Sequence, residues 1–438
     1  MLASILRALV GLAFFCAIAW AMSVHKRRVN VRVIVGGLAT QIVLAFLILR
    51  TGWGRAGLDA LSRAAATLLG FGVDGAAFLF GPLAGFFHDP GAGADGAPQE
   101  IAWFSAYPFH LTAAEQKDVG IVFGLRALPT IIYFSAVMAI LYYLGIMQRL
   151  IWLLAKFMSW SMRVSGAESL AMAANVFVGQ TEAPLVVRPY IGRFTQSELM
   201  ALMTGGFATI AGSVLAVYIG FLGEAYAGHL LAASFMSAPA AFVIAKIMVP
   251  ETEQPMTGST VQLDLERTHV NVLDAAASGT SDGLKLFLNV VAMLIAFVAI
   301  VALINFGLGH LKVTGEPLSL QRIFGWVFAP VAWMMGVAWE DCQTFGSLLG
   351  TKIAVNELVA YGDLAQMLDT GALSERSQRM AAYALCGFAN FSSIGIQLGG
   401  IGPLAPERRP DLSRLALRAM LGGAFASWMT ATIAGMFL

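Results

Sequence analysis

Two glutamates stand in stretches of the chain that are otherwise apolar. Glu182 lies in VFVGQTEAPLVVRPY (176–190), and Glu357 lies in GTKIAVNELVAY (350–361). Near both acids the chain carries amides and hydroxyls, namely Gln180, Thr181, Asn356, Asn390, Ser392 and Ser393. An ionised carboxylate accepts hydrogen bonds strongly, and sugar hydroxyls donate them. These residue types therefore indicate a site for a polar, hydroxyl-rich and uncharged solute.

Each acid has an alternative explanation as half of a structural ion pair. Arg188 or Arg193 could neutralise Glu182. In the same way, Lys352 could neutralise Glu357. A charged side chain at the middle of a bilayer costs about 2.5–3.5 kcal/mol on insertion scales. Both acids must therefore face a cavity, a partner or an ion, and the residue types alone leave the ion pair open.

The composition places these residues in a membrane. The chain has 438 residues, of which 58% are hydrophobic and 12% charged, and its mean hydropathy is +0.75. A soluble domain carries about 25% charged residues. The net charge of +1 indicates no nucleic-acid partner, and the three cysteines lack the spacing of a metal site or a disulfide framework. Residues 3–22 predict a retained membrane helix, with a cleaved signal peptide as the alternative.

Apolar stretches of about 20 residues predict an all-α integral membrane protein with about eight transmembrane helices. Their expected ranges are 3–22, 31–49, 127–147, 197–222, 228–248, 283–307, 380–403 and 415–438. Lys and Arg gather on the cytoplasmic side of a membrane. They follow the first, third and seventh spans here, in HKRR (25–28), in Arg149, Lys156 and Arg163, and in 407–418. The pattern predicts a multi-pass protein of the cytoplasmic (inner) membrane with both termini outside.

Polar or amphipathic segments are expected at the membrane surfaces. They are an outer helix over 57–80, an outer loop at 88–100, a basic inner stretch at 148–165 and a polar inner loop at 250–269. In the outer helix, Asp59, Arg63 and Asp74 should face water, as the polar face of an interfacial helix does. The inner loop shows no apolar periodicity, so no helix is expected there.

Two interrupted apolar stretches, 167–190 and 322–363, do not fit as plain spans. Glycines, prolines and acids break both of them. Non-helical backbone at membrane depth is tolerated only beside protein or a water-filled cavity. We expect both stretches to be re-entrant hairpins, the first entering from inside and the second from outside. Each precedes a span with its own internal break, at 205–213 and at 386–395.

The two breaks share a pattern of Gly-Phe-Ala followed by a polar residue. The pattern starts at Gly206 and at Gly387, and an acid precedes these glycines by 24 residues (206 − 182) and by 30 residues (387 − 357). The chain therefore contains a weak repeat of opposite topology, the feature that marks the binding site of many secondary transporters. Chance similarity is the alternative in a chain rich in glycine and alanine. The expected divisions are 1–165 (N-terminal membrane helices, surface helices and scaffold), 166–249 (transport repeat 1), 250–317 (inner loop and scaffold helix) and 318–438 (transport repeat 2).

The breaks also free backbone carbonyls near the middle of the membrane. Together with a hydroxyl, such carbonyls suit a small hard cation such as Na⁺. Thr209 supplies a hydroxyl at the first break. Its alternative role is the commoner one, in which a threonine bonds back to the preceding helical turn.

The chain as a whole resembles the bacterial type of the concentrative nucleoside transporter family. The resemblance is carried mainly by AANVFVGQTEAPLVVRPYIGRFTQSELMALMTGGFATIAGSVLAVYIGF (173–221), GTKIAVNELVAY (350–361) and ALCGFANFSSIGIQLGGIG (384–402). The motifs GQTEAP and NE-x-V-A-Y together are highly specific, and Leu358 is a mild departure from the phenylalanine often found there. The resemblance implies a homotrimer in which a transport domain moves past a central scaffold in an elevator-like motion.

The resemblance also implies roles for individual residues. The positions that match nucleoside-binding residues are Gln180, Thr181 and Glu182 for the base, Val214 for an apolar wall, Glu357, Asn390 and Ser393 for the ribose, and Phe388 for a site-lining aromatic. The positions that match the sodium site are Asn175, Val178, Thr209 and Ile210. Serine also occurs in the family at the position of Thr209, and threonine keeps its hydroxyl.

We therefore expect symport of a nucleoside such as uridine with Na⁺, without covalent chemistry, so the protein is not expected to be an enzyme. Coupling to H⁺ is the nearest alternative, with Glu182 or Glu357 carrying the proton. An intramembrane hydrolase would need an aspartyl dyad, a metal cluster or a serine–histidine arrangement, and no such motif is present. A channel is a third alternative, but nonidentical inverted halves favour alternating access. No cofactor is expected apart from the coupling ion.

Overall fold

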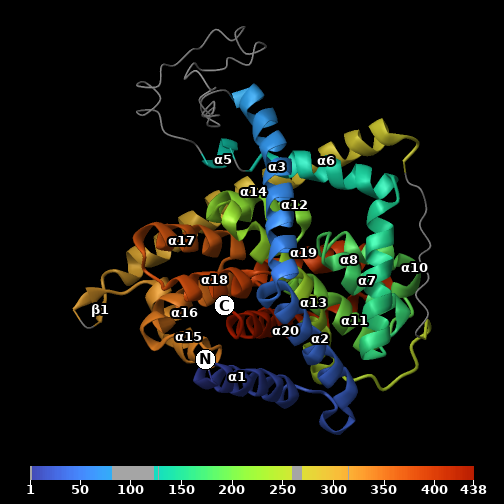
Figure 1. Cartoon of the computed structure of the whole chain (residues 1–438), viewed down its shortest axis with the longest axis horizontal. Helices are drawn as coiled ribbons and strands as arrows, with labels where there is room; N and C mark the ends of the chain where they lie inside the picture. Colours follow the sequence, from blue (N-terminus) through green and yellow to red (C-terminus); the bar gives the residue numbers. More distant parts are fainter. Residues whose placement is uncertain (1, 81–122, 127, 259–268, 314) are drawn as a thin grey trace.

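The protein is built almost entirely from helices. The computed structural model describes residues 2–80, 123–126, 128–258, 269–313 and 315–438, so the predicted outer loop and most of the predicted inner loop lie outside the described residues. Within these ranges the strands are β1 (Lys312–Val313) and β2 (Glu316–Pro317), which form one short antiparallel pair. The expectation of an all-helical protein is confirmed (Figure 1).

The N-terminal part follows the predicted pattern closely. It consists of α1 (Leu2–Ala21), the short helix η1 (Lys26–Arg28), α2 (Val31–Arg50) and α3 (Gly52–Phe80). The side chain of Asn30 caps α2 by accepting a hydrogen bond from the backbone N–H of Arg32. Helix α3 begins before the predicted position 57, and its residues Asp59, Arg63 and Asp74 are exposed as expected.

An elbow replaces the third predicted span, which was expected to run over 127–147. After α5 (Phe123–Arg126), helix α6 covers only Thr130–Tyr143, and α7 (Ile146–Met162) leaves it at an angle of 77°. Gly145 adopts a left-handed conformation with φ of 77°, which glycine tolerates without strain. The basic stretch predicted at 148–165 lies mostly in α7.

The first predicted hairpin and the broken span after it form a series of short helices. They are α8 (Gly166–Asn175), α9 (Ala183–Val186), α10 (Arg188–Ile191), α11 (Gln196–Ala208) and α12 (Gly212–Leu222), followed by η3 (Glu224–Tyr226) and α13 (Ala227–Met248). Reciprocal side-chain and backbone hydrogen bonds cap α8 through Ser165 and Glu168, and α11 through Thr195 and Glu198. We call residues 176–182 the first tip and residues 209–211 the first break.

The second half begins after α14 (Val272–Leu308), which starts 11 residues (283 − 272) before its predicted position. Its elements are α15 (Leu320–Met334), η4 (Trp339–Asp341), α16 (Cys342–Ala354), α17 (Glu357–Thr370), α18 (Glu375–Leu385), α19 (Phe391–Ile401), η5 (Gly402–Leu404), η6 (Pro406–Arg408) and α20 (Arg409–Gly435). The predicted hairpin at 322–363 therefore contains all of α16, most of α15 and half of α17, and its interruption falls at 355–356. We call residues 355–356 the second tip and residues 386–390 the second break.

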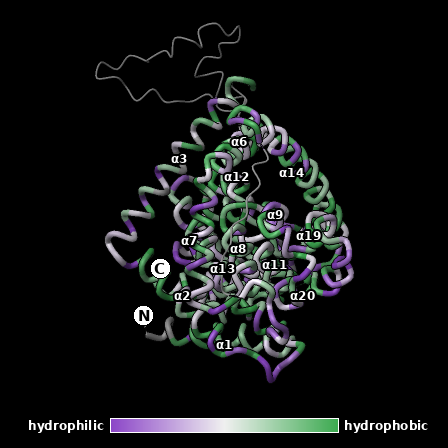
Figure 2. The backbone as a smooth tube through the Cα atoms, turned by 90° about the vertical axis from the view of Figure 1, so that its right-hand side faces the viewer, coloured by the Kyte–Doolittle hydropathy of each residue, from purple (hydrophilic) through white to green (hydrophobic). Residues whose placement is uncertain are grey.

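Four of the described helical segments are long and apolar enough to cross a membrane. They are Val31–Arg50, Gln196–Leu222, Glu224–Met248 and Val272–Leu308, and the bent pair of α6 and α7 would add a fifth. Hydrophobic residues are spread through the helices, among neutral and hydrophilic ones (Figure 2). The other predicted spans correspond to α1, to α18 with α19, and to α20, so the expected total of eight stays a prediction.

The two breaks, which share a sequence pattern, pack directly against each other. Gly387 in the second break has a φ of 102°, and a Cβ atom there would lie 2.6 Å from the carbonyl oxygen of Phe207. Helix α20 packs against the same residue, because a Cβ atom on Gly423 would lie 2.4 Å from Cβ of Phe207. The repeat is thus a packed structural feature, and only glycine allows the two backbones to come this close.

The N-terminus at the start of α1 and the C-terminus after α20 lie near each other (Figure 1). Arg7 in α1 and Arg376 in α18 both donate to the carbonyl oxygen of Gly336, each at 2.9 Å. Arg376 also donates to the carbonyl oxygen of Gly435, near the end of α20, at 2.6 Å. These contacts hold the start of α1 beside the end of α20, as the expectation of both termini on one side requires.

The basic segments gather at the other end of α1. The backbone N–H of Val24 donates to the carbonyl oxygen of Met248 at 3.0 Å. Next to this contact, His25, Arg414 and Arg418 line one small cavity of about 270 Å³. The segments 25–28 and 407–418 were both expected on the cytoplasmic side, and the fold brings them together.

The close contact between the breaks leads to a prediction for Gly387→Ala. The new Cβ atom would collide with the backbone of Phe207 in a conformation that L-residues rarely adopt, so we expect a loss of at least ~2 kcal/mol of stability. Thermal unfolding of the detergent-solubilised protein measures the loss. Gly399→Ala in α19 is the matched control, because nothing lies within 4 Å of its added Cβ atom. Equal melting temperatures for both variants would contradict the packing described here.

Candidate functional site

One large cavity, of about 1520 Å³, collects the acids from which the sequence analysis started. Helices α6 and α14 form one wall, and the two tips and the two breaks supply the facing residues. All eight residues predicted to bind a solute line it: Gln180, Thr181, Glu182, Val214, Glu357, Phe388, Asn390 and Ser393. The prediction placed these residues together although they are up to 213 positions (393 − 180) apart in the chain.

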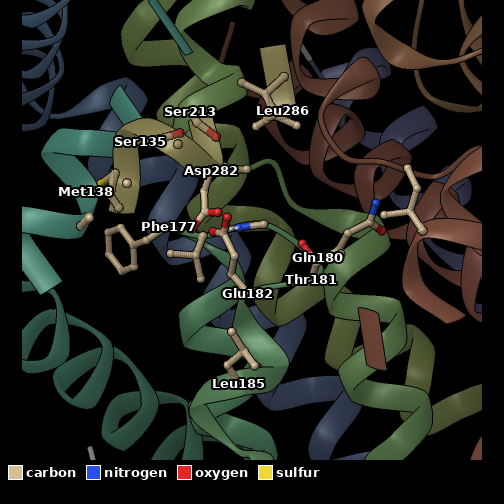
Figure 3. A pocket seen from close by; sticks show the side chains of 18 of the residues that line it. Ser135, Met138, Phe177, Gln180, Thr181, Glu182, Leu185, Ser213, Asp282 and Leu286 are labelled. Atoms are coloured by element: carbon tan, nitrogen blue, oxygen red, sulfur yellow. Dashed lines mark hydrogen bonds between the residues drawn. The ribbon is translucent and has the colours of Figure 1, made fainter. Parts of the chain in front are cut away.

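The first tip is held by backbone contacts to its neighbours. The carbonyl oxygen of Phe177 accepts from the N–H of Gly212 at 3.0 Å, which ties the tip to the start of α12. The carbonyl oxygen of Val176 accepts from Oγ of Ser234 in α13, also at 3.0 Å. Within the tip, Oε2 of Glu182 accepts from the N–H of Gly179 at 3.2 Å. The polar side chains of the tip are thereby presented to the cavity (Figure 3).

Glu357 begins α17 at the second tip and is almost fully buried. Its Oε1 accepts from the hydroxyl of Tyr218 at 3.1 Å, and its Oε2 accepts from Nδ2 of Asn390 at 2.8 Å. Both carboxylate oxygens are therefore acceptors, which fits the ionised acid. Each oxygen has further lone pairs, so the group can still accept hydrogen bonds from a solute.

Helix caps set the positions of these polar residues. Asn390 is the N-cap of α19, where its Oδ1 accepts from the N–H of Ser393 at 2.8 Å and from Oγ of Ser392 at 2.7 Å. Asn356 is the N-cap of α17, where its Oδ1 accepts from the N–H of Val359 at 2.9 Å. Each cap fixes the start of a helix. The capping asparagines therefore fix where α17 begins after the second tip and where α19 begins after the second break.

The structure does not bear out the alternative of structural ion pairs. Lys352 lies within the protein, but its Nζ donates to two backbone carbonyls and a serine rather than to Glu357. Among the described residues, Glu182 and Glu357 have no cationic partner within 4.0 Å, so neither Arg188 nor Arg193 pairs with Glu182. Both carboxylates remain available to whatever occupies the cavity.

The residues predicted for Na⁺ lie beside the cavity. Val178 lines it, whereas Asn175, Thr209 and Ile210 do not line it and are almost fully buried. Both amide atoms of Asn175 lack a hydrogen-bond partner, and a Cβ atom on Gly205 would lie 3.2 Å from its Nδ2. Asn175 is thus next to the helix that ends at the first break.

Thr209 makes the bond that the alternative explanation predicted. Its Oγ1 donates to the carbonyl oxygen of Gly205, one turn earlier, at 2.9 Å. Donation leaves the lone pairs of the hydroxyl free, so this bond is compatible with an oxygen ligand for a cation. A buried, unpartnered amide oxygen on Asn175 and a hydroxyl on Thr209 are the hard donors that Na⁺ prefers, and the residues fit such an ion.

Sequence reasoning missed several polar residues around the cavity. Tyr218 in α12 bonds to Glu357 and stacks on Tyr361, with 4.3 Å between the ring centroids. Asp282 in α14 points toward Glu182 across the cavity (Figure 3). Gln397 in α19 donates to the carbonyl oxygen of Met203 at 3.0 Å. Tyr218 and Gln397 lie in the two broken spans but outside the breaks themselves, and Asp282 precedes the predicted span 283–307, so no local signal singles them out.

The chain is similar to known transporters along almost its whole length. Residues 10–83 and 229–435 match family models described as the N-terminus and the C-terminus of the Na⁺ dependent nucleoside transporter, and residues 124–225 match a model described as nucleoside recognition. An uncharacterized transporter of Haemophilus influenzae is 43% identical, covering 99% of this chain and 98% of its own. The nucleoside permease NupC of Helicobacter pylori is 39% identical, covering 100% and 99%.

A mammalian relative and solved structures give the same result. Sodium/nucleoside cotransporter 1 of Rattus norvegicus is 40% identical over 97% of this chain, which spans 63% of that protein. The transporter CNTnw, in an inward-facing substrate-bound state, matches 99% of this chain and 98% of its own with a TM-score of 0.86 and 40% identity. An outward-facing variant of CNTnw covers the same shares with a TM-score of 0.87.

The bond from Tyr218 to Glu357 leads to a second prediction. Tyr218→Phe removes a donor from a buried carboxylate and keeps the ring that stacks on Tyr361. We expect the variant to be less stable by about 1.5–3 kcal/mol, the range for hydrogen bonds to charged groups. Thermal unfolding tests this, with Tyr133→Phe in α6 as the matched removal of a hydroxyl elsewhere. A Tyr218→Phe protein as stable as the control would exclude a supporting role for this bond.

Proposed function

Because the chain belongs to the bacterial type of the concentrative nucleoside transporter family, we propose that it imports nucleosides such as uridine across the cytoplasmic membrane in symport with Na⁺. Members of this family transport nucleosides and are not enzymes. The observation that carries the proposal is the meeting of Glu357 and Asn390 with the first tip in one cavity. The two tips come from opposite halves of the chain, and a nucleoside has two chemically different halves to recognise.

The ribose is assigned to the second half of the chain. Glu357 accepts hydrogen bonds from the ribose hydroxyls, because its carboxylate retains free lone pairs and has no cationic partner among the described residues. Asn390 and Ser393, joined by a cap hydrogen bond of 2.8 Å, complete the polar contact. Phe388, in the second break, supplies an apolar surface beside them.

The base is assigned to the first half. Gln180, Thr181 and Glu182 at the first tip contact its polar edge, and Val214 in α12 packs against its ring. Oε1 of Gln180 is buried without a hydrogen-bond partner, so it is an acceptor that awaits a donor. An amide and a hydroxyl can each donate or accept, and this versatility suits more than one kind of base.

The Na⁺ site is assigned to Asn175, Val178, Thr209 and Ile210. Support comes from the unpartnered amide of Asn175 and from the position of Thr209 directly after α11. One Na⁺ moving down 100 mV supplies about 2.3 kcal/mol, and a tenfold ion gradient adds about 1.4 kcal/mol. The sum of about 3.7 kcal/mol sustains nucleoside accumulation of a few hundredfold, so one ion per cycle is sufficient.

The transport cycle is assigned to movement of one part of the chain past another. Residues 166–249 and 318–438 form the moving transport domain with its two re-entrant hairpins, and 1–165 and 250–317 contain the scaffold. Relatives are solved in inward-facing, outward-facing and intermediate states, which supports an elevator-like motion. A homotrimer with α14 near its centre accounts for the exposed apolar side chains of that helix, including Ile295, Leu303 and Phe306.

Uptake of labelled uridine into proteoliposomes tests the coupling ion. An inward Na⁺ gradient should drive accumulation above equilibrium, and an inward H⁺ gradient alone should not. Accumulation under H⁺ alone would instead favour the proton-coupled alternative, with the proton on Glu182 or Glu357. Saturable flux that never runs uphill under either gradient would indicate a channel.

Glu357→Gln tests the ribose assignment. The variant keeps the shape of the side chain and loses its charge, so the ribose loses a charged acceptor worth about 1.5–3 kcal/mol. We expect nucleoside affinity to fall by roughly tenfold to a hundredfold in calorimetric titration, with a smaller effect on folding. Unchanged uridine affinity and uptake in a folded Glu357→Gln protein would remove this residue from the site.

A further inference from the structure

Lys352 is a buried cation whose donors are all used inside the protein. Its side chain, near the end of α16, is 0% exposed. Its Nζ donates to the carbonyl oxygens of Ala384 and Cys386 and to Oγ of Ser427, each at 2.9 Å. Three acceptors match the three N–H donors of an ammonium, so the geometry is that of the charged lysine. No carboxylate lies within 4.0 Å of this ammonium among the described residues.

The ammonium occupies a place in the second repeat that corresponds to the proposed Na⁺ site in the first. Lys352 is 11 residues (352 − 341) beyond the N-cap of α16, and Asn175 is 10 residues (175 − 165) beyond the N-cap of α8. Both residues stand near the end of the first helix of a hairpin. Asn175 lies against Gly205, close to the end of α11, and Lys352 binds the carbonyl end of α18.

The oxygen atoms around the ammonium are of the kind that would hold a sodium ion. Two backbone carbonyls and one hydroxyl surround Nζ of Lys352, and backbone carbonyls with a hydroxyl are also the groups proposed for Na⁺ at the first break. The carboxyl end of a helix such as α18 carries partial negative charge, which favours a cation there. The second break therefore holds a side-chain ammonium at the place that corresponds to the proposed Na⁺ site of the first.

We propose that the Lys352 ammonium is a fixed cation that takes the place of a second transported ion, so that the protein moves one Na⁺ for each nucleoside. This inference rests on the proposed function as a Na⁺-coupled nucleoside symporter. A Na⁺ that binds and leaves the first break changes the charge of that half during the cycle. The ammonium of Lys352 stays in place, so the second half keeps its positive charge throughout.

Lys352 is also a positioning residue for the ribose site. The carbonyl of Cys386, which it binds, opens the second break, and Asn390 closes the same break four residues later. Asn390 in turn donates to Glu357 at 2.8 Å. A cation at the carbonyl end of α18 therefore fixes the backbone that places the donor for Glu357.

The first measurement is the ratio of ²²Na⁺ to labelled uridine taken up by the wild-type protein in proteoliposomes. We expect a ratio of about 1 and a Hill coefficient for Na⁺ of about 1. No Na⁺-driven uptake would count against the proposed function itself. Na⁺-driven uptake with a ratio of about 2 would leave the proposed function intact and overturn this inference.

The second measurement uses Lys352→Asn, which removes the ammonium and leaves its oxygen ligands and some space. We expect Na⁺-dependent uridine binding with a Hill coefficient raised to about 2, because an ion from solution fills the vacated place. The uridine affinity at low Na⁺ should fall, and high Na⁺ should restore it. A merely structural lysine would lower affinity without changing the dependence on Na⁺.

Lys246→Asn is the matched control. Lys246 is the other deeply buried lysine among the described residues, and its Nζ pairs with Oε2 of Glu168 at a distance of 2.7 Å. This pair is not part of either break, so the Lys246→Asn protein should keep the wild-type Hill coefficient for Na⁺. A folded Lys352→Asn protein with an unchanged Hill coefficient, or with no uridine binding at any Na⁺ concentration, would overturn the inference. If this variant and Lys352→Gln both fail to fold, the wild-type ratio decides between one ion and two.

Discussion

Backbone hydrogen bonding at the helix breaks is the constraint on which the rest of this structure depends. A break inside a membrane leaves N–H and C=O groups without helical partners, and no bulk water is present to satisfy them. The chain meets this need with capping asparagines at 356 and 390, with the bond from Gly212 to Phe177, and with the ammonium of Lys352 at the end of α18. These contacts stabilise the breaks and at the same time hold the polar residues that line the cavity.

The acids of the cavity differ from Glu168, a buried acid that serves the fold, in how they are satisfied. Glu168 pairs with Lys246 at 2.7 Å and also caps α8, so its acceptor capacity serves the fold. Glu357 instead accepts from a tyrosine and an asparagine, and Glu182 accepts from a backbone N–H. A carboxylate bound only by neutral donors is not neutralised by a cation and keeps lone pairs for a solute. Together with their place in the cavity, this contrast with Glu168 supports the assignment of Glu182 and Glu357 to transport rather than to stability.

The two halves of the chain share an architecture but differ in their chemistry. In each half a capped helix leads to a tip, and a broken helix follows. The halves meet where Gly387 packs against the backbone of Phe207 and Ala208 at the end of α11, without intervening side chains. The polar groups at corresponding places differ, because the first half has an unpartnered asparagine and a threonine hydroxyl where the second half has a lysine. In the proposed cycle this difference assigns ion coupling to the first half and most of the ribose contact to the second.

The sequence by itself determined the helical class, the interrupted segments and the membership of Gln180, Thr181, Glu182, Glu357 and Asn390 in one site. Composition and specific motifs carry that information locally, and the cavity contains all of these residues. The tertiary structure decided which groups the acids contact. Lys352 was a plausible partner for Glu357 by residue type, yet it binds the end of α18. Tyr218 could not be foreseen, because its partner is 139 positions away in the chain and packing of separate helices alone brings them together. The elbow at Gly145 and the early start of α14 were missed for a related reason, since packing between helices sets where a helix ends as much as propensity does.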